Sequence, residues 1–252
     1  MTDKIPGLSG LVVAHNEEAM LDDAFKSLAC CDEIVVVLDR CTDGSKAIAQ
    51  KYTRNIIEGA WEIEGERRML GIEACKGPWI FELDADERLT SELIEEMRTT
   101  LPQTQTGYFL VPILNYVGSR LVQYGWAGSF GTTAAKKLFH KGSKVWGQQR
   151  VHPQVTMKGP EYRLKGGLTH LVDRDIDDMI DRLQRYSRAA AADMRGKPLP
   201  PFRKSLRKGL TRFYKSYISR KGYREGRMGF LLALMAALFP ILSHIKAELE
   251  NQ

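Results

Sequence analysis

The first half of the chain alternates between short apolar runs and stretches with helical spacing, and this alternation restricts the fold more than any other feature. Residues 8–14, 34–38, 55–58 and 79–83 are apolar, often β-branched, runs of strand length. After each run, apolar residues recur every three or four positions, as they do on one face of a helix. Four such cycles predict an α/β fold with a mostly parallel, Rossmann-like sheet flanked by helices.

Polar residues directly follow three of these four predicted strands. Asn16 and Glu17 follow the first strand, Asp39 ends the second, and Asp84 and Asp86 follow the fourth. Ligands of parallel α/β sheets bind beyond the carboxyl ends of the strands. Each of these residues alone could cap a helix or form a turn, but three groups at one edge of a sheet indicate a binding site.

Asp84 and Asp86 are two residues apart and therefore project to the same side of an extended chain. Carboxylates this close repel, and each disfavours ionisation of the other. One or two carboxylates together with substrate phosphates are typical ligands of Mg²⁺ or Mn²⁺, so a divalent cation is one interpretation. The other is a solvated acidic turn that caps the helix predicted from Thr90. The glycine signatures of dinucleotide-binding folds and P-loops do not occur in the sequence, which disfavours a dehydrogenase or a P-loop kinase.

The chain changes character after Leu101. Strands are expected near residues 107–116, 137–140 and 145–155, and no Asp or Glu occurs from Arg98 to Pro160. A helix is expected from about 176 to 194, before a linker rich in proline. We therefore predict a catalytic domain over 1–196, with a nucleotide-binding half at 1–104 and an acceptor half at 105–196. Residues 197–252 are predicted to form a helical tail.

The charge of the chain is concentrated in this tail. The whole chain carries a net charge of +6, whereas residues 203–227, with ten Lys or Arg and one acidic residue, carry +9. The apolar stretch that follows, 229–242, is shorter than the roughly 20 residues of a spanning helix. An apolar stretch of this length beside a basic, aromatic helix predicts an interfacial anchor that lies in the cytoplasmic leaflet. The alternative is an apolar helix packed on the domain or on a second protomer.

The cysteines and the N-terminus indicate a reducing compartment. The four cysteines show no C-x-x-C spacing, and the adjacent pair Cys30 and Cys31 suits small core residues better than a redox pair. The N-terminus lacks a charged segment followed by a long apolar one, so no signal peptide is expected. We therefore expect a cytoplasmic protein, peripheral on the inner face of the plasma membrane.

Three segments, in this order and spacing, resemble the inverting glycosyltransferases of family 2, which have the GT-A fold. They are residues 13–18 (VAHNEE), 36–45 (VVLDRCTDGS) and 83–87 (LDADE). The later part, including Val151-His152 and the basic and apolar tail, resembles the lipopolysaccharide-core branch of that family, which contains bacterial inner-core glucosyltransferases.

The resemblance implies a nucleotide-sugar site at the first two strand ends. Ala14, Asn16 and Glu17 would line the nucleotide pocket, and Asp39 would hydrogen-bond to the uracil or its ribose. The donor would be a UDP-sugar, with UDP-glucose favoured.

The resemblance also implies roles around the fourth strand. Asp84 would face the ribose and the donor, and Asp86 would act in catalysis by binding Mg²⁺ or Mn²⁺ that bridges the diphosphate. Glu66 and Arg67 would contact the donor, although an exposed salt-bridged helix face is an equal alternative. His170 would be a further metal or phosphate ligand, or else a hydrogen-bonded structural histidine.

The base that deprotonates the acceptor hydroxyl is the point where this sequence departs from the family. Members commonly use a carboxylate of the second half, but here the family-like V-H-E reads V-H-P around His152. The imidazole of His152 titrates near neutrality and could serve directly. Other candidates are Glu87, Glu161 and Asp173.

The resulting hypothesis is a hexosyltransferase that acts on a glycolipid or lipopolysaccharide-core saccharide at an anionic membrane and binds no nucleic acid. One alternative is a nucleotidyltransferase that makes a nucleotide-sugar, but it usually needs a glycine-rich N-terminal loop, which is lacking here. The other is a nucleic-acid-binding protein that uses residues 203–227, against which the adjacent apolar stretch argues.

Overall fold

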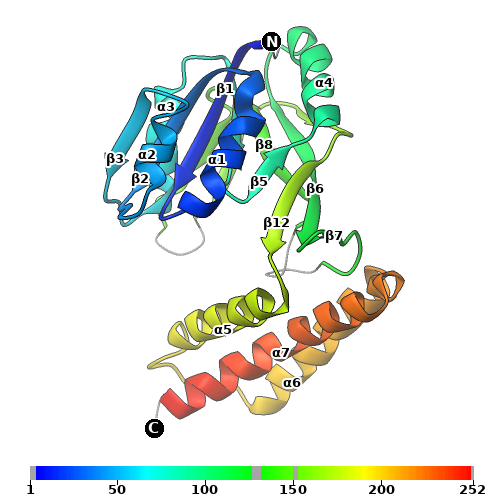
Figure 1. Cartoon of the computed structure of the whole chain (residues 1–252). Helices are drawn as coiled ribbons and strands as arrows, with labels where there is room; N and C mark the ends of the chain where they lie inside the picture. Colours follow the sequence, from blue (N-terminus) through cyan, green and yellow to red (C-terminus); the bar gives the residue numbers. More distant parts are fainter. Residues whose placement is uncertain (1–3, 127–131, 150–152, 251–252) are drawn as a thin grey trace. The chain divides into compact units, whose positions relative to one another are not determined.

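A computed structural model describes residues 4–126, 132–149 and 153–250 of the chain. The chain forms two compact units, shown in Figure 1. We call residues 1–113 with 134–170 the sheet unit, and residues 114–133 with 171–252 the helical unit. The division of the chain into a catalytic domain that ends at residue 196 and a tail from 197 stays a prediction.

The first half of the sheet unit follows the predicted alternation closely. Its elements are β1 (Ile5–Ala14), α1 (Glu18–Ser27), β2 (Cys31–Asp39), α2 (Ser45–Ala49), β3 (Asn55–Gly59), α3 (Glu64–Ala74), β4 (Trp79–Leu83), β5 (Glu87–Leu89) and α4 (Ser91–Thr100). Thr90 caps α4, because its hydroxyl accepts a hydrogen bond from the amide of Leu93. The acidic segment after β4 therefore contains a short strand, and only its last residues lead into the cap.

Residues 108–173, which belong partly to the helical unit, form mainly strands. These are β6 (Tyr108–Val117), β7 (Arg120–Leu121), β8 (Ala134–His140), β9 (Lys144–Trp146), β10 (Val155–Met157), β11 (Glu161–Arg163) and β12 (Leu168–Asp173). The strand predicted over 145–155 is thus an antiparallel pair, β9 and β10.

The main sheet has the order β3-β2-β1-β4-β8-β6-β12-β5. The predicted parallel pairing is confirmed for β3, β2, β1 and β4. From β4 onward the sheet is mixed, because β8 pairs antiparallel with both β4 and β6, and β12 pairs antiparallel with β5. The sheet therefore places the strands of the acid-free segment directly beside the acidic end of β4.

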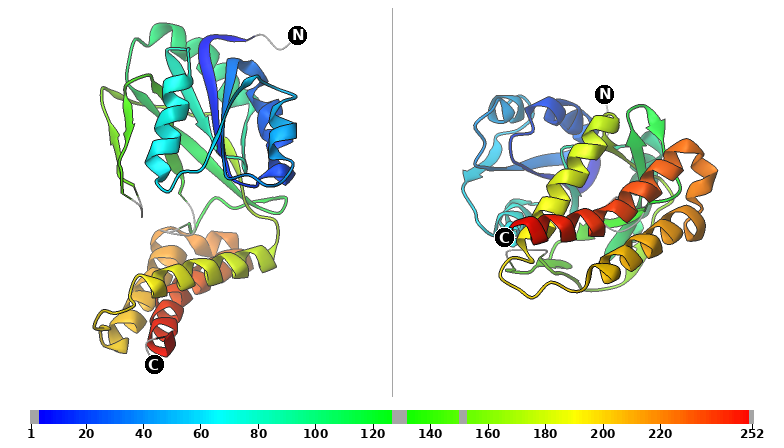
Figure 2. Two further views of the ribbon diagram at one scale, coloured as in Figure 1. Left: turned by 90° about the vertical axis from the view of Figure 1, so that its left-hand side faces the viewer. Right: turned by 90° about the horizontal axis from the view of Figure 1, so that it is seen from below.

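Helices cover both faces of the parallel part, as Figure 2 shows. Alternate residues of β2 separate accordingly: Val36 and Leu38 pack in the cluster that contains α1, and Val35 and Val37 pack in the cluster that contains α3. On the α3 side the approach is close, since a Cβ at Gly71 would lie 2.5 Å from the Leu11 side chain. Both faces of β2 are therefore buried, which explains its uninterrupted β-branched sequence.

The helical unit contains α5 (Ile176–Ala192), α6 (Phe202–Tyr214) and α7 (Arg227–Glu250). The apolar stretch 229–242 is only the middle of α7, which has 24 residues and a length of about 36 Å. The prediction about length concerned residues 229–242 alone, and the whole helix is longer than this stretch. By length and composition alone, residues Arg227–Leu249 are long and apolar enough to cross a membrane. In the most apolar 18-residue segment of this helix, 39% is buried inside the protein.

Candidate active site

The loops after β1 and β2 are tied together at the carboxyl edge of the sheet. Asn16 has a φ of +56°, a left-handed conformation that asparagine tolerates better than most residues. Its side-chain oxygen accepts a hydrogen bond of 2.8 Å from the amide of Thr42. The amide of Glu17 donates to the hydroxyl of Ser45 at 3.1 Å. These contacts fix the first two predicted strand ends next to each other.

Asp39 is completely buried at the end of β2. Its carboxylate accepts a 3.1 Å hydrogen bond from the amide of Trp61 and forms ion pairs with Arg40, at 3.0 Å, and with Arg67. Burial raises the pKa of Asp39, but the hydrogen bonds from Arg40 and Trp61 and the charge of Arg67 outweigh it, so the net pKa lies below the ordinary value. Asp39 is therefore an ionised, fixed hydrogen-bond acceptor.

The low pKa of Asp39 predicts a specific loss of stability in acid. Because the folded-state pKa is below the ordinary 3.8, the ion pairs stabilise the fold above this pH and are lost as the pH falls through the folded-state value. We expect Asp39→Asn to lower the free energy of unfolding by about 3 kcal/mol at pH 7. This deficit should shrink below pH 3.8 in urea titrations of both proteins, and a deficit independent of pH would contradict the assignment.

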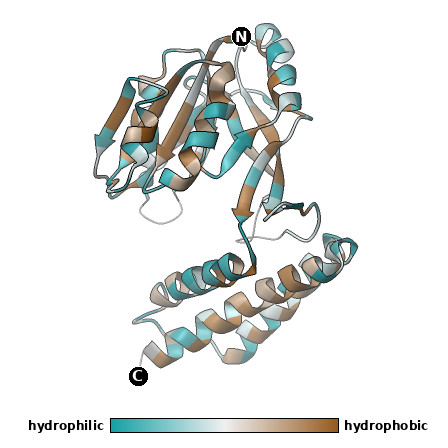
Figure 3. Cartoon of the chain, viewed as in Figure 1, coloured by the Kyte–Doolittle hydropathy of each residue, from teal (hydrophilic) through white to brown (hydrophobic). Residues whose placement is uncertain are grey.

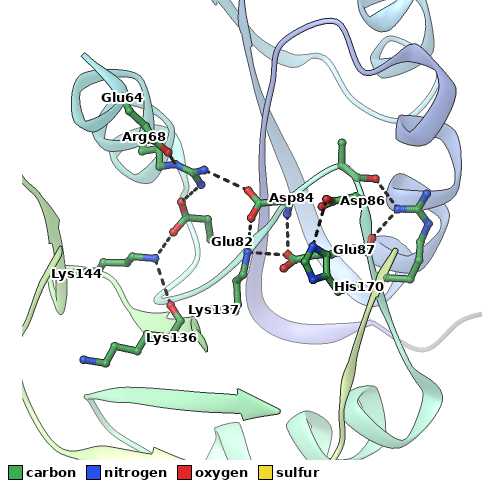
Figure 4. Close-up of polar contacts among 12 residues, drawn as sticks. Glu64, Arg68, Glu82, Asp84, Asp86, Glu87, Lys136, Lys137, Lys144 and His170 are labelled. Carbon is green, nitrogen blue, oxygen red and sulfur yellow. Dashed lines mark hydrogen bonds and ion pairs between the residues drawn. The ribbon is translucent and has the colours of Figure 1, made fainter. Parts of the chain in front are cut away.

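The Asp84 carboxylate is held by two cations. Lys137 of β8 lies 2.5 Å from one of its oxygens, and Arg68 of α3 lies 3.3 Å from the other (Figure 4). Lys137 also contacts Glu87 at 2.7 Å, and Glu87 accepts a 3.0 Å hydrogen bond from the amide of Asp84. Burial raises the pKa of Asp84, but the charges of Lys137 and Arg68 hold it well below the ordinary value. Asp84 is thus a carboxylate whose charge the protein itself neutralises.

Glu82, two residues before Asp84, forms a second group of ion pairs. Glu82 is 1% exposed and pairs with Lys144 of β9 and, at 2.5 Å, with Arg68. Burial raises the pKa of Glu82, but the two cations outweigh it and lower the value to about 2. Arg68 therefore links two acidic residues of the β4 segment, as Figure 4 shows.

Asp86 faces His170 across β5 and β12. The antiparallel register pairs His170 with Glu87, and the Nε2 atom of His170 lies 3.3 Å from a carboxylate oxygen of Asp86. Burial lowers the pKa of His170, but the hydrogen bond and charge of Asp86 raise it above the ordinary value. The strand pairing thus joins two residues far apart in sequence.

The spacing of the two side chains would allow both to bind one divalent cation, provided that His170 is deprotonated. Two adjacent ligands of an octahedral ion, each about 2.1 Å from the metal, lie about 3 Å apart, close to the observed separation of Asp86 and His170. Within residues 4–126, 132–149 and 153–250 there is no group of three or more His, Cys, Asp and Glu that could hold a metal. Mg²⁺ is usually bound through one or two carboxylates, with the remaining positions left to water and phosphate oxygens, so that Asp86 matches this pattern and the imidazole of His170 is a less usual ligand.

A cavity of about 370 Å³ opens beside Asp84. Its lining includes Arg68, Lys137, Lys144 and Trp146, and the Arg68 guanidinium lies 4.8 Å from the centre of the Trp146 ring. The volume is within the range of small-molecule sites. The site therefore combines a fixed acidic edge with a cation-lined hollow.

The remaining predicted residues are distributed differently. Ala14 is the last residue of β1 and is buried, whereas Glu66 is exposed on α3. Arg67, the next residue, contacts Asp39. Among the candidate bases, Glu87 is buried and its pKa is raised by burial despite Lys137. His152 lies outside the described residues.

The other two candidate bases have structural partners. Glu161 is exposed in β11 and accepts a 3.1 Å hydrogen bond from the hydroxyl of Tyr108. Asp173 belongs to the helical unit, where it is buried and paired with Arg182 at 2.7 Å. The role of each predicted site residue in the reaction stays a prediction.

Sequence reasoning missed the cations of this site. Arg68 stands next to Arg67 in the sequence, and Lys137 and Lys144 occur in the segment without Asp or Glu. That segment could have been identified as the source of cations for the acidic end of β4. The individual partners depend on the pairing of β8 with β4, which the sequence does not encode locally.

Comparisons with known proteins agree with this architecture. The family model "Glycosyl transferase family 2" matches residues 9–157. The chain is 28% identical to the lipopolysaccharide core biosynthesis glycosyltransferase LpsC of Rhizobium meliloti, over 98% of this chain and 93% of the relative. It is 24% identical to an uncharacterized glycosyltransferase of Rickettsia conorii, over 94% and 87% of the two chains.

Among solved structures, the chain is similar to residues 1–349 of S. aureus TarS in complex with UDP-GlcNAc. The TM-score is 0.51 at 15% sequence identity, over 97% of this chain and 89% of the other, and this likeness concerns the fold alone. The predicted GT-A fold is thereby confirmed. Since the family model covers more than half of the sequence, the chain belongs to glycosyltransferase family 2.

Proposed function

We propose that this glycosyltransferase transfers a hexose, with inversion, from a UDP-sugar to a saccharide of a glycolipid or of the lipopolysaccharide core. UDP-glucose is the favoured donor. The similarity over nearly the full length to LpsC, a lipopolysaccharide core biosynthesis glycosyltransferase, supports the acceptor class. The observation that carries the proposal is the convergence of Asp39, Asp84 and the Asp86–His170 pair at the carboxyl edge of one sheet.

In this proposal the first two strand ends bind the nucleotide. Asp39 is the proposed acceptor for the uracil or ribose, and its ion pairs keep it ionised and fixed. Its carboxylate is completely buried here, so this role requires that nucleotide binding uncovers it. Asn16 and Glu17, together with Ala14, line the pocket from the adjacent loop. Arg67, which holds Asp39, positions that acceptor.

Asp84 faces the ribose and the donor. Lys137 and Arg68 neutralise it and present positive charge beside the cavity, where a diphosphate leaving group develops negative charge. Asp86 and His170 would hold Mg²⁺ or Mn²⁺, which when bound supplies further neutralisation of that diphosphate. The acceptor hydroxyl must lose a proton, for which His152 and Glu87 are the candidate bases.

The acceptor class sets the proposed location of the enzyme. A glycolipid or lipopolysaccharide-core acceptor lies at a lipid surface, and residues 203–227 supply the positive charge that an anionic inner leaflet attracts. We propose a cytoplasmic enzyme that is peripheral on that leaflet and does not use nucleic acid.

Calorimetric titration with UDP, with and without Mn²⁺, tests the donor site. We expect binding that strengthens at least tenfold with Mn²⁺, because the ion adds contacts to the diphosphate. Asp39→Asn should weaken UDP binding with or without the metal. An absence of UDP binding under every metal condition, with another nucleoside diphosphate bound instead, would reject the UDP assignment.

A further inference from the structure

Helix α6 carries its large apolar residues on its outer face. Four of them recur every fourth residue and therefore lie along one side of the helix. They are Phe202, Leu206, Leu210 and Tyr214, with exposed fractions of 44%, 45%, 65% and 59%. A helix of a water-soluble domain normally buries such a stripe against its core. In α6 the buried positions are instead held by Ser205 and Gly209.

The close packing of α6 on α7 explains this orientation. A Cβ at Gly209 would lie 2.7 Å from the carbonyl oxygen of Ala237, so only a residue without a side chain fits at this contact. The hydroxyl of Ser205 lies 3.2 Å from Nδ1 of the buried His244. Rotating α6 to bury its leucines would replace these small residues with larger ones. The outward stripe is therefore fixed by the fold of the helical unit.

Aromatic residues extend the stripe onto the beginning of α7. The rings of Phe213 and Tyr217 lie 5.8 and 6.0 Å from that of Phe230, and Tyr217 lies 6.4 Å from Tyr223. Phe230 and Tyr223 are themselves half exposed, at 50% and 51%. We call the exposed residues Phe202, Leu206, Leu210, Tyr214, Tyr223 and Phe230 the α6 surface.

The sequence around the α6 surface is strongly basic. Residues 202–224 contain no Asp or Glu. Four basic side chains of α6 are exposed, namely Arg203, Lys204, Arg207 and Lys208. An apolar stripe with basic residues on the rest of the helix, and with tyrosines near its edge, matches helices that lie in the interface of an anionic bilayer.

The apolar helix α7 has a different environment. Leu232, Met235 and Ala236 are buried, in one cluster with Met179 and Leu183 of α5. Hydrophobic residues recur along α7 in Figure 3, but those of this cluster are already in contact with other parts of the helical unit. Insertion of α7 across a bilayer would break the core that they form.

We propose that the α6 surface docks the chain on an anionic lipid leaflet, with α6 lying in the plane of the interface and α7 retained as the core of the helical unit. The inference rests on the proposed function, because a lipid-linked acceptor requires the enzyme at such a surface. It places the anchor on α6, whereas the sequence alone suggested residues 229–242.

Co-sedimentation of the full chain with vesicles tests the proposal. We expect binding to vesicles of phosphatidylcholine with phosphatidylglycerol, weak binding to phosphatidylcholine alone, and release by alkaline carbonate. The double variant Leu206→Glu/Leu210→Glu should reduce binding to the anionic vesicles at least tenfold, because it removes two apolar anchors and adds negative charge. The matched control is Ile176→Glu/Ile180→Glu on α5, where both positions are similarly exposed, at 49% and 40%, and binding should be unchanged.

Circular dichroism and UDP titration of each variant separate docking from folding and from donor binding. Loss of vesicle binding by the α6 variant with intact UDP binding supports the proposal. If the wild type itself does not bind UDP, that result bears on the proposed function and not on the membrane surface. Equal losses in both double variants, or full binding by the α6 variant, would overturn the α6 assignment. Resistance of wild type to carbonate would show that α7 spans the bilayer, and displacement of vesicles by an oligonucleotide would indicate a nucleic-acid surface instead.

Discussion

Asp86→Ala should lower kcat/KM for sugar transfer by on the order of 10²- to 10³-fold, the size typical for removing one group that stabilises transition-state charge. The Asp86 side chain is 40% exposed and its contact is the 3.3 Å pair with His170, so the fold should survive the substitution. The loss has a physical cause in the site: without the carboxylate, His170 alone would remain to hold a divalent cation at this edge of the sheet. Release of UDP from UDP-glucose in the presence of acceptor measures the effect.

A matched control is Asp23→Ala on α1. Asp23 is also an exposed aspartate, paired with Lys26 at 3.0 Å on the helix surface. Its removal should leave kcat/KM within about twofold of wild type, because an exposed ion pair contributes little to the stability of the fold. If Asp86→Ala turned over at the rate of this control, the proposed metal and catalytic roles of Asp86 would have to be abandoned.

Lys144→Met should destabilise the sheet unit by roughly 3–5 kcal/mol, the range found when one partner of a buried ion pair is removed. The side chains of Lys144 and Glu82 are 6% and 1% exposed, so water cannot replace the lost partner. Arg68 remains 2.5 Å from Glu82, but its positive charge is shared with Asp84 and Glu64. Urea unfolding at pH 7, followed by circular dichroism, gives the free energy of unfolding.

The double variant Glu82→Leu/Lys144→Met removes both charges of the buried pair and tests how much their desolvation costs. Replacing both buried charges with apolar groups is often neutral or stabilising, because neither charge then has to be desolvated. We expect the double variant to be more stable than Lys144→Met alone. A double variant less stable than Lys144→Met would mean that Glu82 still stabilises the fold through its ion pair with Arg68.

The site shows why strand ends were easier to predict than their partners. Asp39, Asp84 and Asp86 each follow an apolar run, and the position of a residue at the end of a parallel strand is a local property of the sequence. The partner of Asp84 could not be predicted in this way, because Lys137 is separated from Asp84 by 53 residues. Only the antiparallel pairing of β8 with β4 brings the two together.

The α/β class, the four parallel strands and the acidic edge where they end could all be predicted from local patterns in the sequence. Hydrophobic periodicity sets which face of each element is buried, and this information is carried by residues close in the chain. Tertiary structure alone decided that His170 meets Asp86, which depends on the register of β12 against β5. It also decided that α6 turns its large apolar residues outward, because the close contact at Gly209 leaves no space for them on the side of α7. Both outcomes depend on packing between distant segments, whose energy no local pattern of residues specifies.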